Sequence, residues 1–128
     1  MSLLDLFFPR KCPYCLKLIE RGRLECDKCR SEFPKEPYIR TIPSGNECVS
    51  AFMYDSKIRD ALARYKFRGK REFYKSFGAV LANAVAESEI IADMVTSVPL
   101  SKKRLHMRGY NQSCLLYTSP SPRDRQKS

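Results

Sequence analysis

Four cysteines near the N-terminus constrain the fold more than any other feature of this chain. They form two Cys-x-x-Cys pairs, C-P-Y-C and C-D-K-C, separated by ten residues: Cys12, Cys15, Cys26 and Cys29. Two such pairs joined by a short loop are the ligand set of a tetrahedral zinc ribbon. Four thiolates complete the coordination sphere and leave no position for water, so the pattern predicts a structural rather than a catalytic Zn²⁺.

The segment around these cysteines has few other means of folding. Residues 11–30 contain a handful of apolar side chains, too few for a core of their own. A structural zinc contributes about 10–16 kcal/mol of folding free energy, which would supply what the side chains lack. Two disulfides, with three possible pairings, are the alternative. Nothing marks the chain as secreted, which favours zinc.

Length and charge limit the function classes. With 128 residues, the chain is long enough for one ordinary domain, or for a small metal module and part of another. Its formal charge is +10. A zinc held by four thiolates carries about two negative charges, and a C-terminal stretch of doubtful origin adds positive charge. The remaining body, at roughly +6, is compatible with binding nucleic acid or phosphate.

The N-terminus, M-S-L-L-D-L-F-F-P-R, is apolar but too short to span a bilayer, and it lacks the basic start of a signal peptide. We expect a short amphipathic helix whose side chains Leu3, Leu4 and those of residues 6–8 dock on the zinc module. No other stretch approaches a transmembrane length. The sequence therefore predicts no membrane insertion and a soluble, cytoplasmic protein.

The middle of the chain reads as a linker, a strand and a helix. Prolines punctuate residues 31–46, which we expect to form an extended linker with a turn at 43–46. The short aromatic stretch 47–54 favours a strand. A helix is predicted from a cap at Ser56 to a stop at Gly69. Its apolar positions follow a spacing of i, i+3, i+4 and i+7: Ile58, Ala61, Leu62 and Tyr65.

A second helix is predicted over about residues 72–88. The side chains expected on its buried face are Phe73, Phe77, Val80, Leu81, Ala84 and Val85. The β-branched stretch 94–100 then predicts another strand. The order strand, helix, helix, strand is typical of the opening of an α/β domain.

Two basic regions are candidate binding sites. The first follows the polar face of the first long helix and the turn after it, and predicts nucleic-acid contacts: Arg64, Lys66, Arg68, Lys70 and Arg71. The second, predicted as a loop over 101–113, follows the end of a strand, where open α/β sheets bind ligands. Its candidate phosphate-binding residues are Lys102, Lys103, Arg104, Arg108, Gly109 and Asn111. Asn111 is also expected to cap a following helix.

A solvated basic loop without a ligand explains the second region equally well. The single histidine, His106, lies in it and is expected to face solvent rather than act as a base. The sequence contains no Ser/His/Asp set, no paired carboxylates and no Walker-type glycine loop, so no catalytic residue is assigned.

The last fifteen residues differ in character from the rest. Residues 114–128 read C-L-L-Y-T-S-P-S-P-R-D-R-Q-K-S, without hydrophobic periodicity. One interpretation is a disordered basic extension. However, the run from Cys114 to Asp124 resembles the translation of a transposase adapter used in DNA sequencing libraries. Residues 114–128 are therefore predicted to be a non-native tail, and the natural chain to continue differently after Ser113.

Taken together, the motifs resemble the ComF family of competence-associated, phosphoribosyltransferase-like proteins. The resemblance rests on the opening L-L-D-L-F-F-P, the four cysteines, Y-K-F-R-G-K at 65–70 and R-x-x-x-R-G-Y-N-Q at 104–112. It implies an α/β fold. An N-terminal helix and Cys₄ zinc ribbon over residues 1–36 would precede the first part of a type I phosphoribosyltransferase-like domain over 47–113. In that fold, residues 100–111 would face the pyrophosphate of phosphoribosyl pyrophosphate.

The resemblance also implies partners. Family members resemble cytosolic proteins that help bring single-stranded DNA into naturally competent bacteria, so single-stranded DNA and proteins of the competence machinery are the expected partners. Phosphoribosyltransferases also hold Mg²⁺ and phosphoribosyl pyrophosphate with two adjacent acids and a Thr/Gly-rich turn. The stretch around Asp93 has one acid and no such turn. Those two ligands are therefore expected only in a longer chain, and this fragment is expected to be inactive as an enzyme.

Three functions remain open from the sequence. The first is handling of single-stranded DNA during natural transformation. The second is transfer of a phosphoribosyl group, with the catalytic motif lost by truncation. The third is a zinc-ribbon scaffold without catalysis.

Overall fold

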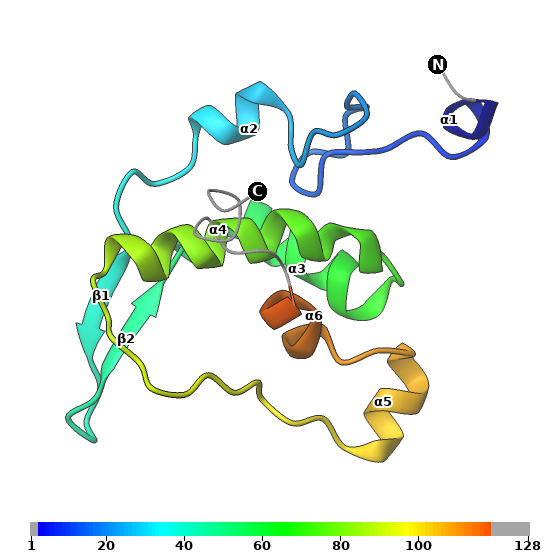
Figure 1. The fold of residues 1–128 in the computed structure, drawn as a ribbon. Coiled ribbons are helices and arrows are strands. Elements are labelled where there is room, and N and C mark those ends of the chain that lie inside the picture. The colour runs from blue at the N-terminus through cyan, green and yellow to red at the C-terminus, as the bar shows by residue number, and fades with distance from the viewer. Residues whose placement is uncertain (1–2, 119–128) are drawn as a thin grey trace.

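The structure is a computed structural model that describes residues 3–118 (Figure 1). Its elements in chain order are α1 (Leu3–Phe7), α2 (Asp27–Ser31), β1 (Tyr38–Thr41), β2 (Glu47–Ser50), α3 (Ser56–Phe67), the 3₁₀ turn η1 (Arg71–Phe73), α4 (Tyr74–Glu87), α5 (Lys102–Arg108) and α6 (Gln112–Thr118). Helices α3 and α4 form the centre. The cysteine-rich segment lies along one side of them and the β1–β2 hairpin at one end (Figure 1).

The hairpin corrects the expectation of a linker over 31–46. Strand β1 pairs antiparallel with β2, with Tyr38 opposite Ser50 and Thr41 opposite Glu47. The predicted turn is present, since the N–H of Gly45 donates to Ile42 O at 2.9 Å. That turn brings the β-prone sequence Y-I-R-T beside its partner, and pairing then makes it a strand. The strand predicted over 47–54 is confirmed but ends early, at the last residue of β2.

Helix α3 forms where its periodicity predicts it. Its cap is one residue earlier than expected: the Asp55 carboxylate, not Ser56, accepts the N–H of Ile58 at 2.8 Å. An ionised carboxylate there also faces the positive end of the helix dipole. Ala61 and Tyr65 are buried as predicted. After the helix ends, Gly69 takes a left-handed φ of 67°, which fits its predicted role as the stop.

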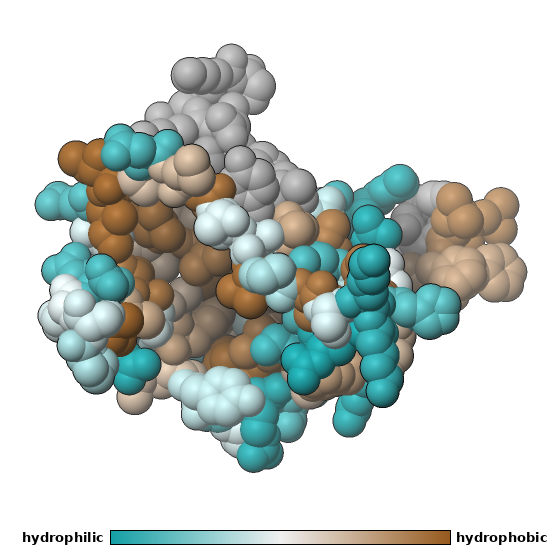
Figure 2. Space-filling view, turned by 90° about the horizontal axis from the view of Figure 1, so that it is seen from below, coloured by the Kyte–Doolittle hydropathy of each residue, from teal (hydrophilic) through white to brown (hydrophobic). Residues whose placement is uncertain are grey.

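The helix predicted over 72–88 is confirmed as η1 followed by α4. Phe73, Phe77 and Ala84 are buried, as expected. Leu81 and Val85 were also expected to be buried, and this is wrong, because both are exposed. Their side chains are 40 % and 43 % exposed, so the neighbouring elements cover them only in part. Figure 2 shows apolar side chains gathered in a hollow on the face of the molecule seen from below.

The strand predicted over 94–100 does not form. This segment, the long yellow trace in Figure 1, is irregular, and Met94 and Val98 are exposed. A strand is stabilised by hydrogen bonds to a neighbouring strand. Within residues 3–118 no strand lies beside this segment, since the sheet contains β1 and β2 alone.

The prediction of a basic loop over 101–113 is also wrong, because most of these residues are helical. The Ser101 hydroxyl caps α5 by accepting the N–H of Arg104 at 3.3 Å, and Gly109 ends it with φ 78°. Asn111 caps α6 as predicted, since its Oδ1 accepts the N–H of Ser113 at 3.0 Å. Helix α6 includes residues 114–118 of the predicted non-native tail. Residues 119–128 lie outside the described part of the chain, and the origin of the tail stays a prediction.

The N-terminal helix α1 forms but does not dock. Its large apolar side chains are exposed rather than packed on the zinc module, which corrects the expectation. Figure 1 shows α1 extended away from the central helices. The five-residue helix ends at Phe7, and the chain reaches the first cysteine through Pro9.

One apolar core joins the cysteine-rich segment to the helices. Its buried members are Cys12, Tyr14, Cys29, Ile58, Ala61, Tyr65, Phe73, Phe77 and Tyr110. The Tyr14 ring lies 5.0 Å from Phe33 and 5.6 Å from Phe77, both in edge-to-face geometry. Such aromatic pairs add stabilisation beyond their buried area. Within residues 3–118, no helix is long and apolar enough to cross a membrane.

Candidate metal centre and basic cleft

The first cysteine pair lies on a tight turn. The N–H of Cys12 donates to Lys17 O at 2.8 Å, and the N–H of Leu16 donates back to Cys12 O at 2.9 Å. Leu16 has a left-handed φ of 63°, which reverses the chain directly after Cys15. This reversal aims Cys12 and Cys15 toward the same point.

The second pair opens a short helix. Cys26 is the N-cap of α2, and its Sγ accepts the N–H of Cys29 at 3.4 Å. One helical turn therefore separates the two thiols and places them on the same face.

The four thiols form one cluster. Their sulfur atoms all lie within 4.8 Å of one another, and Cys15 Sγ lies 3.6 Å from Cys26 Sγ. A tetrahedral zinc with Zn–S bonds of about 2.3 Å places its sulfurs about 3.8 Å apart, so the four residues fit a zinc ion. The separation is far longer than an S–S bond, and all four cysteines are free thiols. Among residues 3–118, no other group of three or more His, Cys, Asp or Glu could hold a metal.

The surroundings of two of these thiols shift their pKa values in opposite directions. The backbone N–H of Cys29 lowers the pKa of the Cys26 thiol to about 7, because the hydrogen bond stabilises the thiolate. Burial raises the pKa of the Cys29 thiol to about 12. The Lys57 ammonium donates to the Glu32 carboxylate and also interacts with the Cys29 thiol, and these contacts raise the pKa of Lys57. A cation at this position partly offsets the negative charge of a zinc–tetrathiolate centre.

Buried polar contacts attach the ribbon to the helices. Ser76 Oγ on α4 donates to Glu25 Oε2 at 2.8 Å, so the Tyr14 hydroxyl donates to Ser76 at 3.2 Å. The Glu25 side chain is 4 % exposed and pairs with Arg30 Nε at 3.0 Å. On the α3 side, Arg64 Nη1 donates to Pro13 O at 2.9 Å. These contacts fix the orientation of the ribbon against both central helices.

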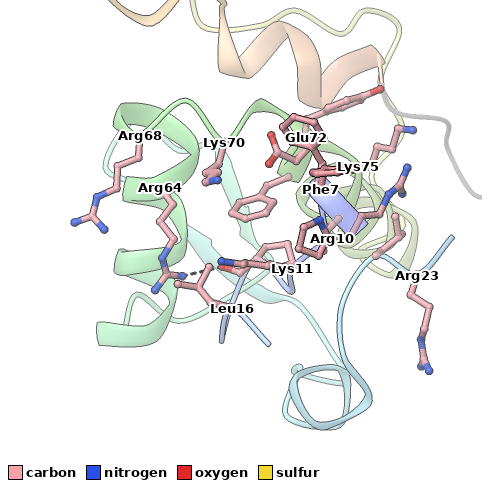
Figure 3. Close-up of a pocket in the computed structure, with 17 residues that line it drawn as sticks. Phe7, Arg10, Lys11, Leu16, Arg23, Arg64, Arg68, Lys70, Glu72 and Lys75 are labelled. Atoms are coloured by element: carbon pink, nitrogen blue, oxygen red, sulfur yellow. Dashed lines mark hydrogen bonds between the residues drawn. The ribbon is translucent and has the colours of Figure 1, made fainter. Parts of the chain in front are cut away.

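A cleft of about 770 Å³ lies where the first cysteine turn meets the end of α3. Figure 3 shows basic side chains arriving from both walls. Seven basic residues line it, Arg10, Lys11 and Arg23 from the ribbon, Arg64, Arg68 and Lys70 from α3 and the following turn, and Lys75 from α4. Glu72 is the acidic residue in this lining. The remaining wall is largely apolar and includes Phe7, Phe8 and Phe73.

Arg64 has the most constrained position in this cleft. Its contact with Pro13 O orients the guanidinium, while its Nε atom is buried and has no hydrogen-bond partner among the described residues. A buried donor left without a partner costs roughly 1–3 kcal/mol.

The comparisons with known proteins agree with the cysteine cluster. Residues 3–40 match the double zinc ribbon domain family. The chain is also 33% identical over 70 residues to the competence protein ComFC of Bacillus subtilis (strain 168). The chain is ComF-like. This alignment covers 52% of the chain and 28% of the Bacillus protein. No solved structure matches the chain.

The cleft of this ComF-like chain contains part of the predicted nucleic-acid site. Arg64, Arg68 and Lys70 line it, whereas Lys66 and Arg71 do not. The Arg71 guanidinium instead lies 6.0 Å from the centre of the Tyr110 ring.

Sequence reasoning missed the other half of the lining. Arg10 and Lys11 directly precede the first ligand cysteine, which is the signal that could have placed them on the ribbon surface. Arg23 and Lys75 carry no comparable signal, because their approach to the cleft depends on how the ribbon packs against α4.

The second predicted site lies elsewhere. Lys102, Lys103 and Arg104 are exposed on α5, and Arg108 packs over the Phe67 ring at 4.9 Å. Gly109 and Asn111 have structural roles as helix caps, and His106 is exposed as expected. Within residues 3–118, no group of three or more acidic side chains gathers at α5. A role for α5 in binding phosphate stays a prediction.

Proposed function

We propose that this ComF-like chain binds single-stranded DNA in a competence-related role, as part of DNA handling during natural transformation. The observation that carries the proposal is the cleft at the junction of the ribbon and α3. Seven basic side chains and one acidic side chain line it. The similarity to a protein named for competence supports the biological setting.

The charge of the cleft favours a polyanion over a single small anion. Its cations come from three separate segments, the ribbon, the end of α3 with its turn, and the start of α4. A phosphate chain can contact such a distributed set in sequence and release counterions at each contact. Arg64 supplies a guanidinium that Pro13 O already orients, so part of the ordering cost is met before the ligand arrives.

The salt dependence of binding tests this proposal. The double variant Arg68→Ala/Lys70→Ala removes two cleft cations, and Lys102→Ala/Lys103→Ala removes the same charge from α5. For a single strand, each lost phosphate contact lowers the log–log salt slope by about 0.7. We expect the slope to fall by about 1.4 in the cleft variant and to stay unchanged in the α5 variant. Fluorescence anisotropy with a labelled oligonucleotide measures both.

Two results would contradict the proposal. One is a wild-type chain whose oligonucleotide binding is absent or insensitive to salt. The other is an equal loss of slope in the cleft and α5 variants, which would mean that net charge rather than the cleft attracts the DNA.

Transfer of a phosphoribosyl group and a scaffold role remain predictions. The first is supported by the three exposed cations of α5, which would suit a pyrophosphate. Calorimetry with phosphoribosyl pyrophosphate and Mg²⁺ tests it on a protein that also carries the two adjacent acids and the Thr/Gly-rich turn. Binding that the α5 variant abolishes would favour this role.

A further inference from the structure

Two phenylalanines at the mouth of the basic cleft have no place in the core. Phe7 and Phe8, at the end of α1, are 72 % and 76 % exposed. Both line the cleft. In the view of Figure 3, Phe7 lies near Arg10 and Lys75, on the side of the cleft opposite Arg64 and Arg68. Large apolar side chains exposed together commonly mark a binding surface.

The surroundings of these rings indicate what they contact. Along the chain, the sequence F-F-P-R-K places two aromatic residues next to two cations. Across the cleft, Tyr74 adds a partly buried ring beside Lys75. Aromatic rings interleaved with cations match a ligand that alternates flat apolar faces with regular negative charges. An unpaired nucleic-acid strand has this pattern, since its phosphates repeat and its bases expose their faces.

We propose that Phe7 and Phe8 stack against unpaired bases of a strand whose phosphates are held by the cations of the cleft. This inference rests on the proposed function and extends it, because it assigns base contacts to α1. Duplex DNA does not fit the same role, because its base faces are stacked within the helix. The site would therefore prefer single strands.

Two other partners, a lipid surface and a protein segment, fit the cleft and its exposed phenylalanines less well than a single strand does. An anionic lipid surface could contact the exposed rings of α1, but a flat bilayer cannot reach the partly buried Arg64 inside the cleft. An apolar protein segment would leave seven cations with one acidic neighbour, Glu72, and would gain nothing from them. Charge complementarity therefore favours the strand.

Variants that replace the two rings but keep apolar side chains distinguish base stacking from contact with a lipid surface or a protein. The double variant Phe7→Leu/Phe8→Leu retains the hydrophobic surface but removes the flat aromatic faces. Each lost base stack is expected to weaken single-strand affinity roughly 5- to 150-fold. The salt slope should not change, because no phosphate contact is lost. Duplex affinity should also be unchanged. Tyr54→Leu, at a 73 % exposed aromatic outside the cleft, is the matched control and should bind like wild type.

A second readout reports stacking itself. The chain has no tryptophan, so the fluorescence of 2-aminopurine in the oligonucleotide can be followed without protein background. We expect wild type and Tyr54→Leu to quench this probe, and the double variant to leave it unquenched. Both phenylalanines are exposed, so neither substitution disturbs the core.

The outcomes distinguish this inference from the proposed function. If wild type binds the strand and the double variant binds equally well, the stacking role is wrong while the DNA-binding proposal stands. If wild type binds no oligonucleotide, both the stacking role and the DNA-binding proposal are wrong. Equal binding of wild type and the double variant to phosphatidylglycerol vesicles, with unchanged DNA affinity, would assign α1 to a lipid surface and overturn the inference.

Discussion

Leu16 shows how the metal site imposes strain on a single residue. Its left-handed φ of 63° reverses the chain after Cys15. For a residue with a Cβ this conformation costs roughly 1–2 kcal/mol, whereas glycine adopts it freely. The ribbon tolerates the cost because the reversal completes the first pair of ligands.

Replacement of Leu16 measures this strain. Leu16→Gly and Leu16→Ala both remove the side chain, but only the glycine variant relieves the backbone. Glycine also gives up roughly 0.5–1 kcal/mol of chain entropy. We expect Leu16→Gly to be more stable than Leu16→Ala by about 1 kcal/mol in denaturant unfolding with saturating zinc. An alanine variant as stable as the glycine variant would contradict the claim that the backbone is strained at Leu16.

The thiol of Cys26 sets a pH limit for zinc binding. Its pKa is lowered to about 7, so above that pH it binds zinc without first losing a proton. Below about pH 7 the thiol is protonated, and one more proton competes with the metal. We expect the apparent zinc affinity to fall with decreasing pH, and by an additional factor of about ten per pH unit below 7. Competition with a chromophoric chelator between pH 8 and 5.5 measures this. If the zinc affinity changed with pH at the same rate above and below pH 7, the lowered pKa of Cys26 would be contradicted.

At the scale of elements, local signals predicted what depends on local structure. The cysteine pairs, the apolar spacing of α3 and the stop at Gly69 all act within a few residues, and the structure contains each of them. The helix of residues 74–87 followed from its spacing for the same reason.

Elements that depend on distant neighbours were harder to predict. Strand β1 forms because a turn places it beside β2, and the sequence of β1 alone resembles a linker. Residues 94–100 have a strand-like sequence but no partner strand within the described chain. Residues 101–113 were predicted as a loop because they follow a predicted strand, yet a serine cap and a left-handed glycine define the ends of α5 there.

At the scale of the whole molecule, the ribbon is part of the core rather than an appendage. Tyr14, Cys12 and Cys29 are buried together with residues of α3 and α4. The same packing closes the basic cleft, because Arg10, Lys11 and Arg23 reach it only from the ribbon. The sequence indicated the metal ligands and the cations of α3 separately. Their combination in one site required the three-dimensional packing of Tyr14 and Glu25 against α4.

If the cleft binds DNA as proposed, this packing makes that binding depend on zinc. Without the metal, residues 11–30 lose their main source of folding free energy. The three ribbon cations then leave the cleft, and four of its seven cations remain, on α3, the following turn and α4. Zinc would therefore act as a structural cofactor of the DNA site without touching the DNA.

The most direct test compares single-strand binding with and without zinc at matched salt. We expect one zinc per chain, and a fall of at least about 2 in the log–log salt slope after chelation, from three lost contacts at about 0.7 each. Added zinc should restore binding. Cys26→Ser should lose both zinc and DNA affinity, whereas Cys48→Ser, outside the cluster, should keep both. Unchanged affinity and slope in the zinc-free chain, or one retained zinc in Cys26→Ser, would contradict the account.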